Sequence, residues 1–388
     1  MHGHLARLPH GGVVLREPDG ATVTLGDAAP FNAEIEIHDW DSYRMMMTGG
    51  ALGAAEAYLA KAWDSPDLVA VIRYFAANVD AMRALEGGAA VLAKPALKLL
   101  HLTHRNTRAG SRRNIAAHYD LGNDFFALFL DRAMMYSSAI YPTPDADLET
   151  AAAHKLDVIC QRLELTPAST CWRSAPAGAG WPARRPPLRR ARDHHHHFRE
   201  QARHAREQVR AAGLEDRIDV LEKDYRELTG RYDRVVSVEM IEAVGHQYLD
   251  GYFRMLGERL KPDGLLLLQA ITVPDHRYQY ARDNVDFIKR YIFPGGFLPS
   301  VSVMCAGLRR QTRLTPVGLD DIGADYGRTL GDWRERFLRA LPRIRELGFD
   351  ERFCRMWDYY LCYCQGAFME RAISTVHLLA AGPDYRRL

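Results

Sequence analysis

The sequence lacks the features that would place it in several special classes of protein. It has no apolar run long enough to span a bilayer, and its first residues carry no signal-peptide core. Its six cysteines follow no framework spacing, which indicates a reducing compartment. The net charge is only +2, from 51 Lys and Arg against 49 Asp and Glu, which excludes a strongly basic nucleic-acid binder.

The composition that remains is that of a globular protein. Hydrophobic residues make up 47% of the 388 residues and charged residues 26%, so the chain is not disordered. A chain of this length is expected to form about two to three domains.

One segment, residues 171–198, differs from the rest in composition. It holds four prolines and four consecutive histidines, and six arginines against one aspartate give it a net charge of +5, so the other residues sum to −3. No helical or strand period runs through it. It could be a basic loop that contacts phosphate, or a His-rich tract that binds metal. Four adjacent histidines cannot all point at one ion, so we expect no metal site.

A misread codon frame explains the segment better. With GC-rich codons, reading residues 171–182 one base early gives V-L-E-I-G-T-G-W-G-G-L-A. Reading residues 188–198 from the second base gives Y-G-A-R-V-T-T-T-T-I. Together these describe an apolar strand, a glycine turn and a β-branched strand, the unit in which a backbone approaches a ligand at the edge of a parallel sheet. The codons are assumed, so the frame is a hypothesis that sequencing of the gene tests.

The residues after this segment follow an α/β pattern. We expect a helix over about 199–212 that ends at Gly213, and then strands over 218–222, 232–238 and 265–271. Asp224 and Tyr225 stand at the tip of the first of these strands. A strand, a helix and further strands with polar tips predict a doubly wound α/β sheet.

Several long motifs, in order, resemble the cyclopropane-fatty-acyl-phospholipid synthase family of S-adenosylmethionine-dependent enzymes. The matching pieces are residues 118–126, 130–139, 237–246, 291–300, 323–326 and 364–368, with 56–58 and 63–64 near the N-terminus. The likeness covers about residues 10–380. It implies an α/β fold: a Rossmann-like methyltransferase domain with a smaller N-terminal α+β domain.

The resemblance implies a domain plan and an activity. Residues 1–93 would form an accessory lipid- or dimer-contact domain, 94–113 a basic linker and 114–388 the catalytic domain, with an acyl slot built from 115–165 and 275–330. The implied reaction transfers a methylene group from S-adenosylmethionine to the cis double bond of phospholipid acyl chains, forming a cyclopropane ring through a carbocation. Two alternatives stay open: a methyltransferase that leaves methyl-branched chains, and an inactive lipid-binding pseudoenzyme if segment 171–198 is genuine.

The family's base is a bound bicarbonate ion, and the resemblance assigns its ligands. They are the residues Ser138, Glu242, Gln269, Ile271 through its backbone, and Tyr326. Ser138 stands where many members have Cys, and Gln269 where many have His, yet both still offer hydrogen bonds to an oxyanion.

Other residues of the motifs have expected roles in the same reaction. Aromatic faces stabilise a cation, and the candidates are Tyr136, Tyr291, Phe293 and Tyr326. Cys364 matches a cysteine proposed as catalytic in the family. Methylene transfer requires no thiolate, so a small buried apolar role is the alternative.

The expected S-adenosylmethionine contacts come from three parts of the chain. By resemblance, Tyr136 and Ser137 would meet the methionine end and Gln201 the ribose, while Asp224 and Tyr225 would bracket the adenine. The glycines of the first turn are absent from the sequence as written.

The implied substrate lies in a membrane. Residues 94–113 are basic and partly apolar, and each Lys or Arg near an anionic surface contributes about 1 kcal/mol. We therefore expect a cytoplasmic protein associated peripherally with the inner face of the membrane; a solvated linker is the alternative. The expected partners are phospholipid acyl chains and no nucleic acid, and a homodimer is left open.

Overall fold

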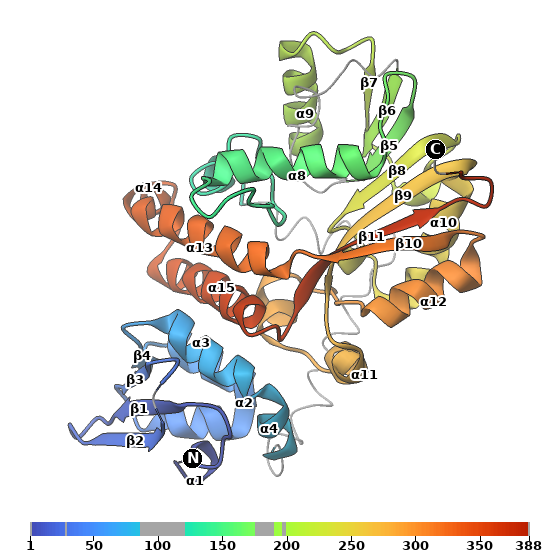
Figure 1. Ribbon diagram of the computed structural model, residues 1–388. Helices are drawn as coiled ribbons and strands as arrows, with labels where there is room; N and C mark the ends of the chain where they lie inside the picture. The colour runs from blue at the N-terminus through green and yellow to red at the C-terminus, as the bar shows by residue number, and fades with distance from the viewer. Residues whose placement is uncertain (1, 28, 86–120, 175–189, 196–198, 387–388) are drawn as a thin grey trace. The chain divides into compact units, whose positions relative to one another are not determined.

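The structure is a computed structural model that describes residues 2–27, 29–85, 121–174, 190–195 and 199–386 (Figure 1). It divides into two compact units. One comprises Met1–Thr103, Asp283–Pro294 and Leu330–Ile373, and the other His104–Arg282, Gly295–Thr329 and Ser374–Leu388. The expected domain boundaries near 93 and 113 lie outside the described residues. Within those residues no helix is long and apolar enough to cross a membrane.

The first unit is built on a four-stranded sheet of order β2-β1-β3-β4. Strand β1 is antiparallel to β2 and parallel to β3, and β3 is antiparallel to β4. The strands are β1 (Gly12–Arg16), β2 (Thr22–Gly26), β3 (Ala33–Ile37) and β4 (Trp63–Asp64). The helices are α1 (His2–Leu5), α2 (Asp41–Leu59), α3 (Leu68–Ala77), α4 (Val79–Leu85), α14 (Leu341–Glu346) and α15 (Glu351–Met369), with a π-helical turn η4 (Ile288–Ile292).

Arg355 of α15 ties the N-terminal motifs of this unit together. Its Nη2 donates to the carbonyl of Tyr58 at 2.8 Å and to Asp64 Oδ1 at 3.2 Å, and its guanidinium lies 4.0 Å from the centroid of the Tyr58 ring. A planar guanidinium can bond a carboxylate and a carbonyl and still stack on a ring. The motifs at 56–58 and 63–64 therefore have a structural role within the first unit.

The second unit is built on a seven-stranded sheet of order β10-β11-β9-β8-β5-β6-β7. Strands β7, β6, β5, β8 and β9 run parallel, and β11 is antiparallel to both β9 and β10. The strands are β5 (Thr170–Ser174), β6 (Arg190–His195), β7 (Ile218–Leu221), β8 (Tyr232–Val238), β9 (Leu260–Thr272), β10 (Thr315–Asp321) and β11 (Ser374–Ala381). The helices are α7 (Asn123–Phe126), α8 (Leu148–Arg162), α9 (Arg199–Ala211), α10 (Leu249–Arg259), α11 (Asp275–Asp283) and α12 (Val301–Gln311), with short 3-10 turns η1 (Tyr225–Glu227), η2 (Ile241–Ala243) and η3 (His246–Tyr248). Helix α13 (Gly323–Arg339) begins in this unit and continues in the first unit from Leu330.

The elements expected after residue 198 are present. Strand β8 has the predicted bounds, β7 ends one residue early, and the strand predicted over 265–271 lies inside the longer β9. Helix α9 ends at Ala211, and Gly213 beyond it has φ +63°, the left-handed conformation typical of a helix end. Strands β5 and β6 are parallel neighbours in the segment for which a strand–turn–strand unit was expected. The α/β fold class is confirmed.

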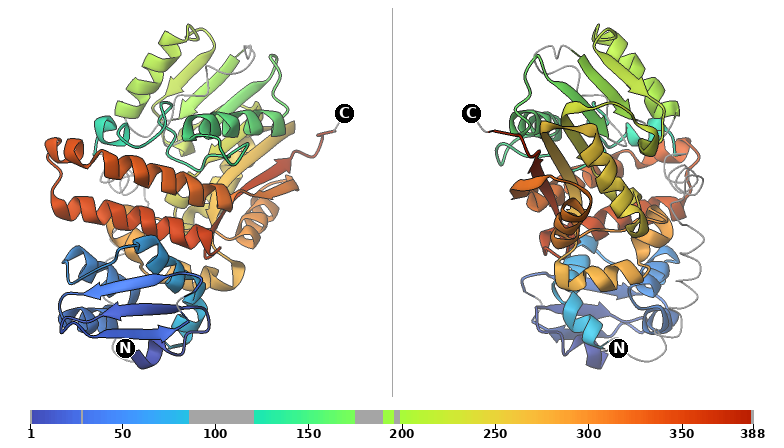
Figure 2. Two further views of the ribbon diagram at one scale, coloured as in Figure 1. Left: turned by 60° about the vertical axis from the view of Figure 1, so that its left-hand side comes forward. Right: turned by 90° about the vertical axis from the view of Figure 1, so that its right-hand side faces the viewer.

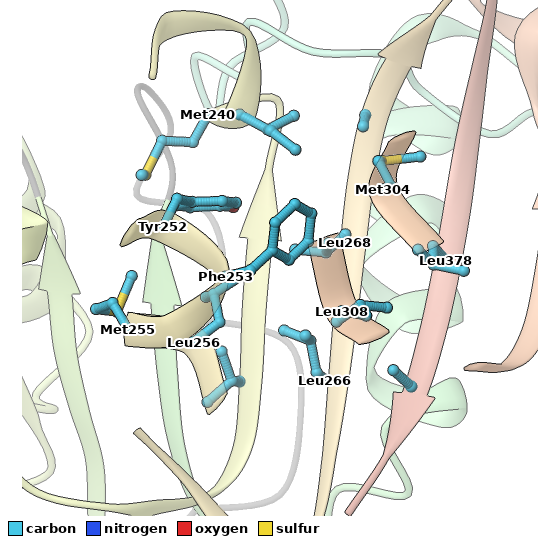
Figure 3. Close-up of a cluster of buried hydrophobic side chains, with 14 of the residues drawn as sticks. Met240, Tyr252, Phe253, Met255, Leu256, Leu266, Leu268, Met304, Leu308 and Leu378 are labelled. Atoms are coloured by element: carbon cyan, nitrogen blue, oxygen red, sulfur yellow. The ribbon is translucent and has the colours of Figure 1, made fainter. Parts of the chain in front are cut away.

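Both faces of the large sheet are covered by helices (Figure 2). Because side chains alternate along a strand, Leu266 and Leu268 of β9 face helices α10 and α12, while Leu265 and Leu267 face α8. Figure 3 shows the first of these clusters, in which Phe253 of α10 lies close to α12. A Cβ at Gly307 would come within 2.3 Å of the Phe253 ring, so only glycine allows α10 and α12 to pack this closely. This core packs against the strands whose ends carry the polar groups described next.

Candidate active site

Two glutamates stand where β8 ends. Glu239 follows the strand directly and Glu242 lies in η2. The carboxyl ends of parallel strands are where ligands bind in open α/β sheets. Glu239 has φ +45°, a left-handed conformation that costs a non-glycine residue about 1 kcal/mol. Such strain is maintained only where the surrounding contacts hold the residue in place.

Three donors surround the carboxylate of Glu239. Its Oε1 accepts from the backbone N–H of Ser138 at 3.0 Å and from Nε2 of Gln269 at 2.8 Å, and its Oε2 accepts from the hydroxyl of Tyr326 at 2.8 Å. The pKa of Glu239 is raised, because burial outweighs the charge of Lys155 and these hydrogen bonds, all of which lower it. All three donors belong to residues that the family resemblance assigned to the bicarbonate site.

Glu242 has a different environment from Glu239. Its Oε1 accepts from the backbone N–H of Ile271 at 2.6 Å, and its buried Oε2 has no hydrogen-bond partner among the described residues. Burial, and then the charge of Glu239, raise the pKa of Glu242 to about 8. Glu242 is therefore largely protonated at neutral pH, whereas Glu239 has the donors that an ionised carboxylate requires.

The amide of Gln269 has its orientation set by His377. The two residues lie directly opposite each other on β9 and β11, and Nε2 of His377 is 3.0 Å from Oε1 of Gln269. Since Nε2 of Gln269 donates to Glu239, its Oε1 must accept, so His377 carries its proton on Nε2. Burial lowers the pKa of His377 to about 3, which keeps the ring neutral. The sequence gives no signal for His377, because only the strand register brings it here.

Lys155 is a second residue that sequence reasoning missed. It is fully buried in α8, and its Nζ donates to Oγ of Ser137 at 2.6 Å. Burial lowers its pKa to about 8, against the opposing effect of Glu239. Ala151 and Ile159, four residues before and after it, are also buried. A lysine on the apolar face of a predicted helix was the available signal.

The expected cofactor residues are described in part. Tyr136 is buried, with its ring 5.2 Å from that of Phe126. Asp224 accepts from the backbone N–H of Arg226 at 3.0 Å and so begins η1. The ring of Tyr225 packs at 5.9 Å from Tyr252 and at 5.0 Å from the Arg226 guanidinium, so it belongs to the core here. Gln201 lies in α9, and its side chain is outside the described part.

Three expected residues belong to the first unit. Tyr291 donates to Oε1 of Glu56 at 2.7 Å, and Phe293 packs edge-on against Tyr360. Burial raises the pKa of the Cys364 thiol, which disfavours a thiolate. This favours the small-residue interpretation of Cys364. Residues 94–113 and 118–120 lie outside the described part of the chain. Among the described residues, no group of three or more His, Cys, Asp or Glu is placed to hold a metal ion.

One strand of the sheet carries a conflict. Arg173 in β5 is 3% exposed, and its Nη2 lies 3.8 Å from Sδ of Met135. Burial lowers the pKa of Arg173 to about 10, and its positive charge is one of the causes that lower the pKa of Lys155. Arg173 and Lys155 are both buried cations whose charges repel each other, and burying like charges in one core is unfavourable.

Comparison with known proteins now decides the family. Residues 106–378 match the family model described as mycolic acid cyclopropane synthetase. The chain belongs to this family. It is 37% identical to tuberculostearic acid methyltransferase UfaA1 of Mycobacterium tuberculosis, covering 88% of this chain and 82% of that one. It is 34% identical to cyclopropane-fatty-acyl-phospholipid synthase of Escherichia coli, covering 91% and 88%.

Solved structures agree with this assignment. Cyclopropane synthase MmaA2 from Mycobacterium tuberculosis superposes with a TM-score of 0.61 at 26% identity, covering 70% of this chain and 98% of that one. Mycolic acid cyclopropane synthase CmaA1, bound to SAH and CTAB, superposes with a TM-score of 0.62 and the same identity and coverage. The predicted family, the Rossmann-like methyltransferase fold and the class of S-adenosylmethionine-dependent, lipid-modifying enzyme are confirmed.

Proposed function

We propose that the chain transfers a methylene group from S-adenosylmethionine to the cis double bond of unsaturated phospholipid acyl chains, closing a cyclopropane ring through a carbocation. The observation that carries the proposal is the acid pair Glu239 and Glu242 at the carboxyl end of β8, in a chain of this family. Ring closure requires a base that takes a proton from the transferred carbon. A desolvated carboxylate is suited to that role.

Lipid mass spectrometry tests this activity. The purified full chain is incubated with S-adenosylmethionine and vesicles of unsaturated phospholipid. We expect acyl chains that are heavier by one CH₂ and have lost the double bond. Unchanged lipids, from a chain that binds S-adenosylmethionine in isothermal titration, would contradict the proposal.

Formation of a methyl branch is the second candidate. It is favoured by the 37% identity to a relative named as a tuberculostearic acid methyltransferase and by the 34% identity to a probable fatty acid methyltransferase of Pseudomonas putida. Both products can arise from the same carbocation. A saturated methyl-branched chain contains two more hydrogens than the ring, so the same mass spectra separate the two.

The family's bicarbonate does not fit the site as it stands. Of its five expected ligands, Ser138, Gln269 and Tyr326 donate to Glu239, and Glu242 is bonded to the N–H of Ile271. A separate anion would have to displace a carboxylate that already holds these donors. We therefore derive no step through bicarbonate.

Binding of S-adenosylmethionine depends on segment 171–198. If the segment is genuine, Arg173 stands beside the expected cofactor turn, and the inactive lipid-binding pseudoenzyme is the better proposal. The structure favours a misread frame, because the frame-restored V-L-E-I places a glutamate at position 173. A carboxylate there would attract the charge of Lys155, whereas the charge of Arg173 opposes it. Sequencing codons 165–200 tests the frame, and codons incompatible with the two shifted phases would contradict it.

Membrane contact is a further part of the proposal. Residues 94–113 would bind anionic headgroups, and the N-terminal domain would contact lipid or a second subunit. In a liposome-flotation assay, neutralising the lysines and arginines of this linker is expected to reduce binding. Unchanged flotation would leave the solvated linker as the better explanation.

A further inference from the structure

Glu239 lies among the residues that the family resemblance assigns to the bicarbonate site. The N–H of Ser138, the amide of Gln269 and the hydroxyl of Tyr326 converge on its carboxylate at 2.8 to 3.0 Å. A carboxylate and a bicarbonate ion present the same planar O–C–O group to hydrogen-bond donors. The donors thus already surround an anion of this shape, and the protein supplies it.

We propose that the carboxylate of Glu239 replaces bicarbonate as the built-in base of this enzyme. The inference rests on the proposed function for its substrate, and on the hydrogen bonds of Glu239 for its assignment. Glu239 would then be a further catalytic residue. It lies in the motif of residues 237–246, but the resemblance assigns it no role.

The arrangement leaves one oxygen of Glu239 better able to accept a proton. Oε1 accepts two of the three hydrogen bonds and Oε2 only one. After methyl transfer, Oε2 takes a proton from the new methyl group of the carbocation. The electron pair of that C–H bond forms the third C–C bond of the ring. Glu239 ends the step protonated and later releases its proton to water.

Neighbouring groups favour the ionised form of Glu239 and hold it in place, although burial still leaves its pKa above the ordinary value. Lys155 supplies an opposing positive charge, and His377 holds Gln269 with its nitrogen toward Glu239. The left-handed backbone at Glu239, φ +45°, is one that glycine adopts without strain. A glycine at this position would open the site to an external anion, and this provides a direct test.

The experiment uses the full chain with ¹³C-labelled bicarbonate as the probe, followed by NMR without S-adenosylmethionine. We expect no bicarbonate binding to the unmodified chain, and binding to Glu239→Gly, in which the donors lose their carboxylate. Glu17→Gln is the matched control, because Glu17 is also buried and accepts from a tyrosine, Tyr43, at 2.6 Å, but lies in the first unit. The control is expected to bind no bicarbonate and to retain full activity.

Lipid turnover in CO₂-free buffer supplies the second readout. We expect the unmodified chain to be independent of bicarbonate and Glu239→Gln to lose about 100-fold or more of kcat, without rescue by bicarbonate. Glu239→Gly should recover activity when bicarbonate is added. Bicarbonate binding by the unmodified chain, an active Glu239→Gln, or a folded Glu239→Gly that binds no bicarbonate would each overturn the inference. If no variant acts on lipid, the proposed function fails, and the binding measurements still decide the role of Glu239.

Discussion

Buried charges have different surroundings in two regions of the same sheet. Where β8 and β9 end and β11 begins, the carboxylate of Glu239 meets three donors, and the donor Gln269 is itself held by His377. In β5, two strands away from β9, Arg173 is a second buried cation, and its charge is one of the causes that lower the pKa of Lys155. A folded core accommodates a buried charge when opposite charge or hydrogen bonds compensate it. The like charges of Arg173 and Lys155 therefore distinguish β5 from the end of β8, where the donors around Glu239 are complementary to its charge.

Replacing the cation in β5 is expected to have the largest effect on stability. Arg173→Glu would replace a buried charge that repels Lys155 with one that attracts it, and we expect it to raise the free energy of unfolding by about 3 kcal/mol. Urea denaturation measures the change. As a control, the same substitution at the exposed Arg203 should alter stability by no more than about 0.5 kcal/mol. A destabilised Arg173→Glu chain would show that position 173 is adapted to arginine.

Substitution of Lys155 provides a second test of the same comparison. In the chain as written, Lys155→Met removes one of two like charges and should change the free energy of unfolding little. In the Arg173→Glu chain the same substitution leaves a carboxylate without its partner, and we expect a loss of about 2–3 kcal/mol. The measurement is a double-mutant cycle by urea denaturation. Equal losses in both backgrounds would mean that the two residues are not coupled.

The acid pair predicts a dependence of stability on pH. The pKa of Glu242 is raised to about 8 in the folded state, so between the unfolded value and 8 the folded state binds more protons than the unfolded state. Stability from this group is therefore present at low pH and lost as pH rises, by up to about 1.4 kcal/mol per pH unit. Glu242→Gln, which keeps the acceptor for the N–H of Ile271, should flatten the profile. A profile unchanged by the substitution would contradict the raised pKa.

The smallest expected effect concerns His377. His377→Leu removes the donor to Oε1 of Gln269 and leaves a buried acceptor without its bond, a loss of about 1–2 kcal/mol. His377→Gln keeps an N–H donor and should recover part of the lost free energy of unfolding. In a Gln269→Leu background the His377→Leu substitution should have a smaller effect, and additive losses would show that the two side chains act independently.

Much of the second unit could be predicted from the sequence. The apolar run over 232–238 and the helix that ends before Gly213 follow from periodicity and end signals, and the structure has both. The motifs also named Ser138, Glu242, Gln269 and Tyr326, which the structure brings to one place. Glu239 was visible in the same motif, but nothing in a linear sequence shows that the other residues would turn their donors toward it.

The sequence by itself determined the family, the fold class and the set of polar residues at the strand ends, because these depend on local order and spacing. The tertiary structure alone decided which partners those residues have. The register of β9 with β11 places His377 opposite Gln269, and the packing of α8 buries Lys155 beside Ser137. Hydrogen bonds and desolvation depend on contacts between segments far apart in the chain, and they make Glu239 the anion of the site.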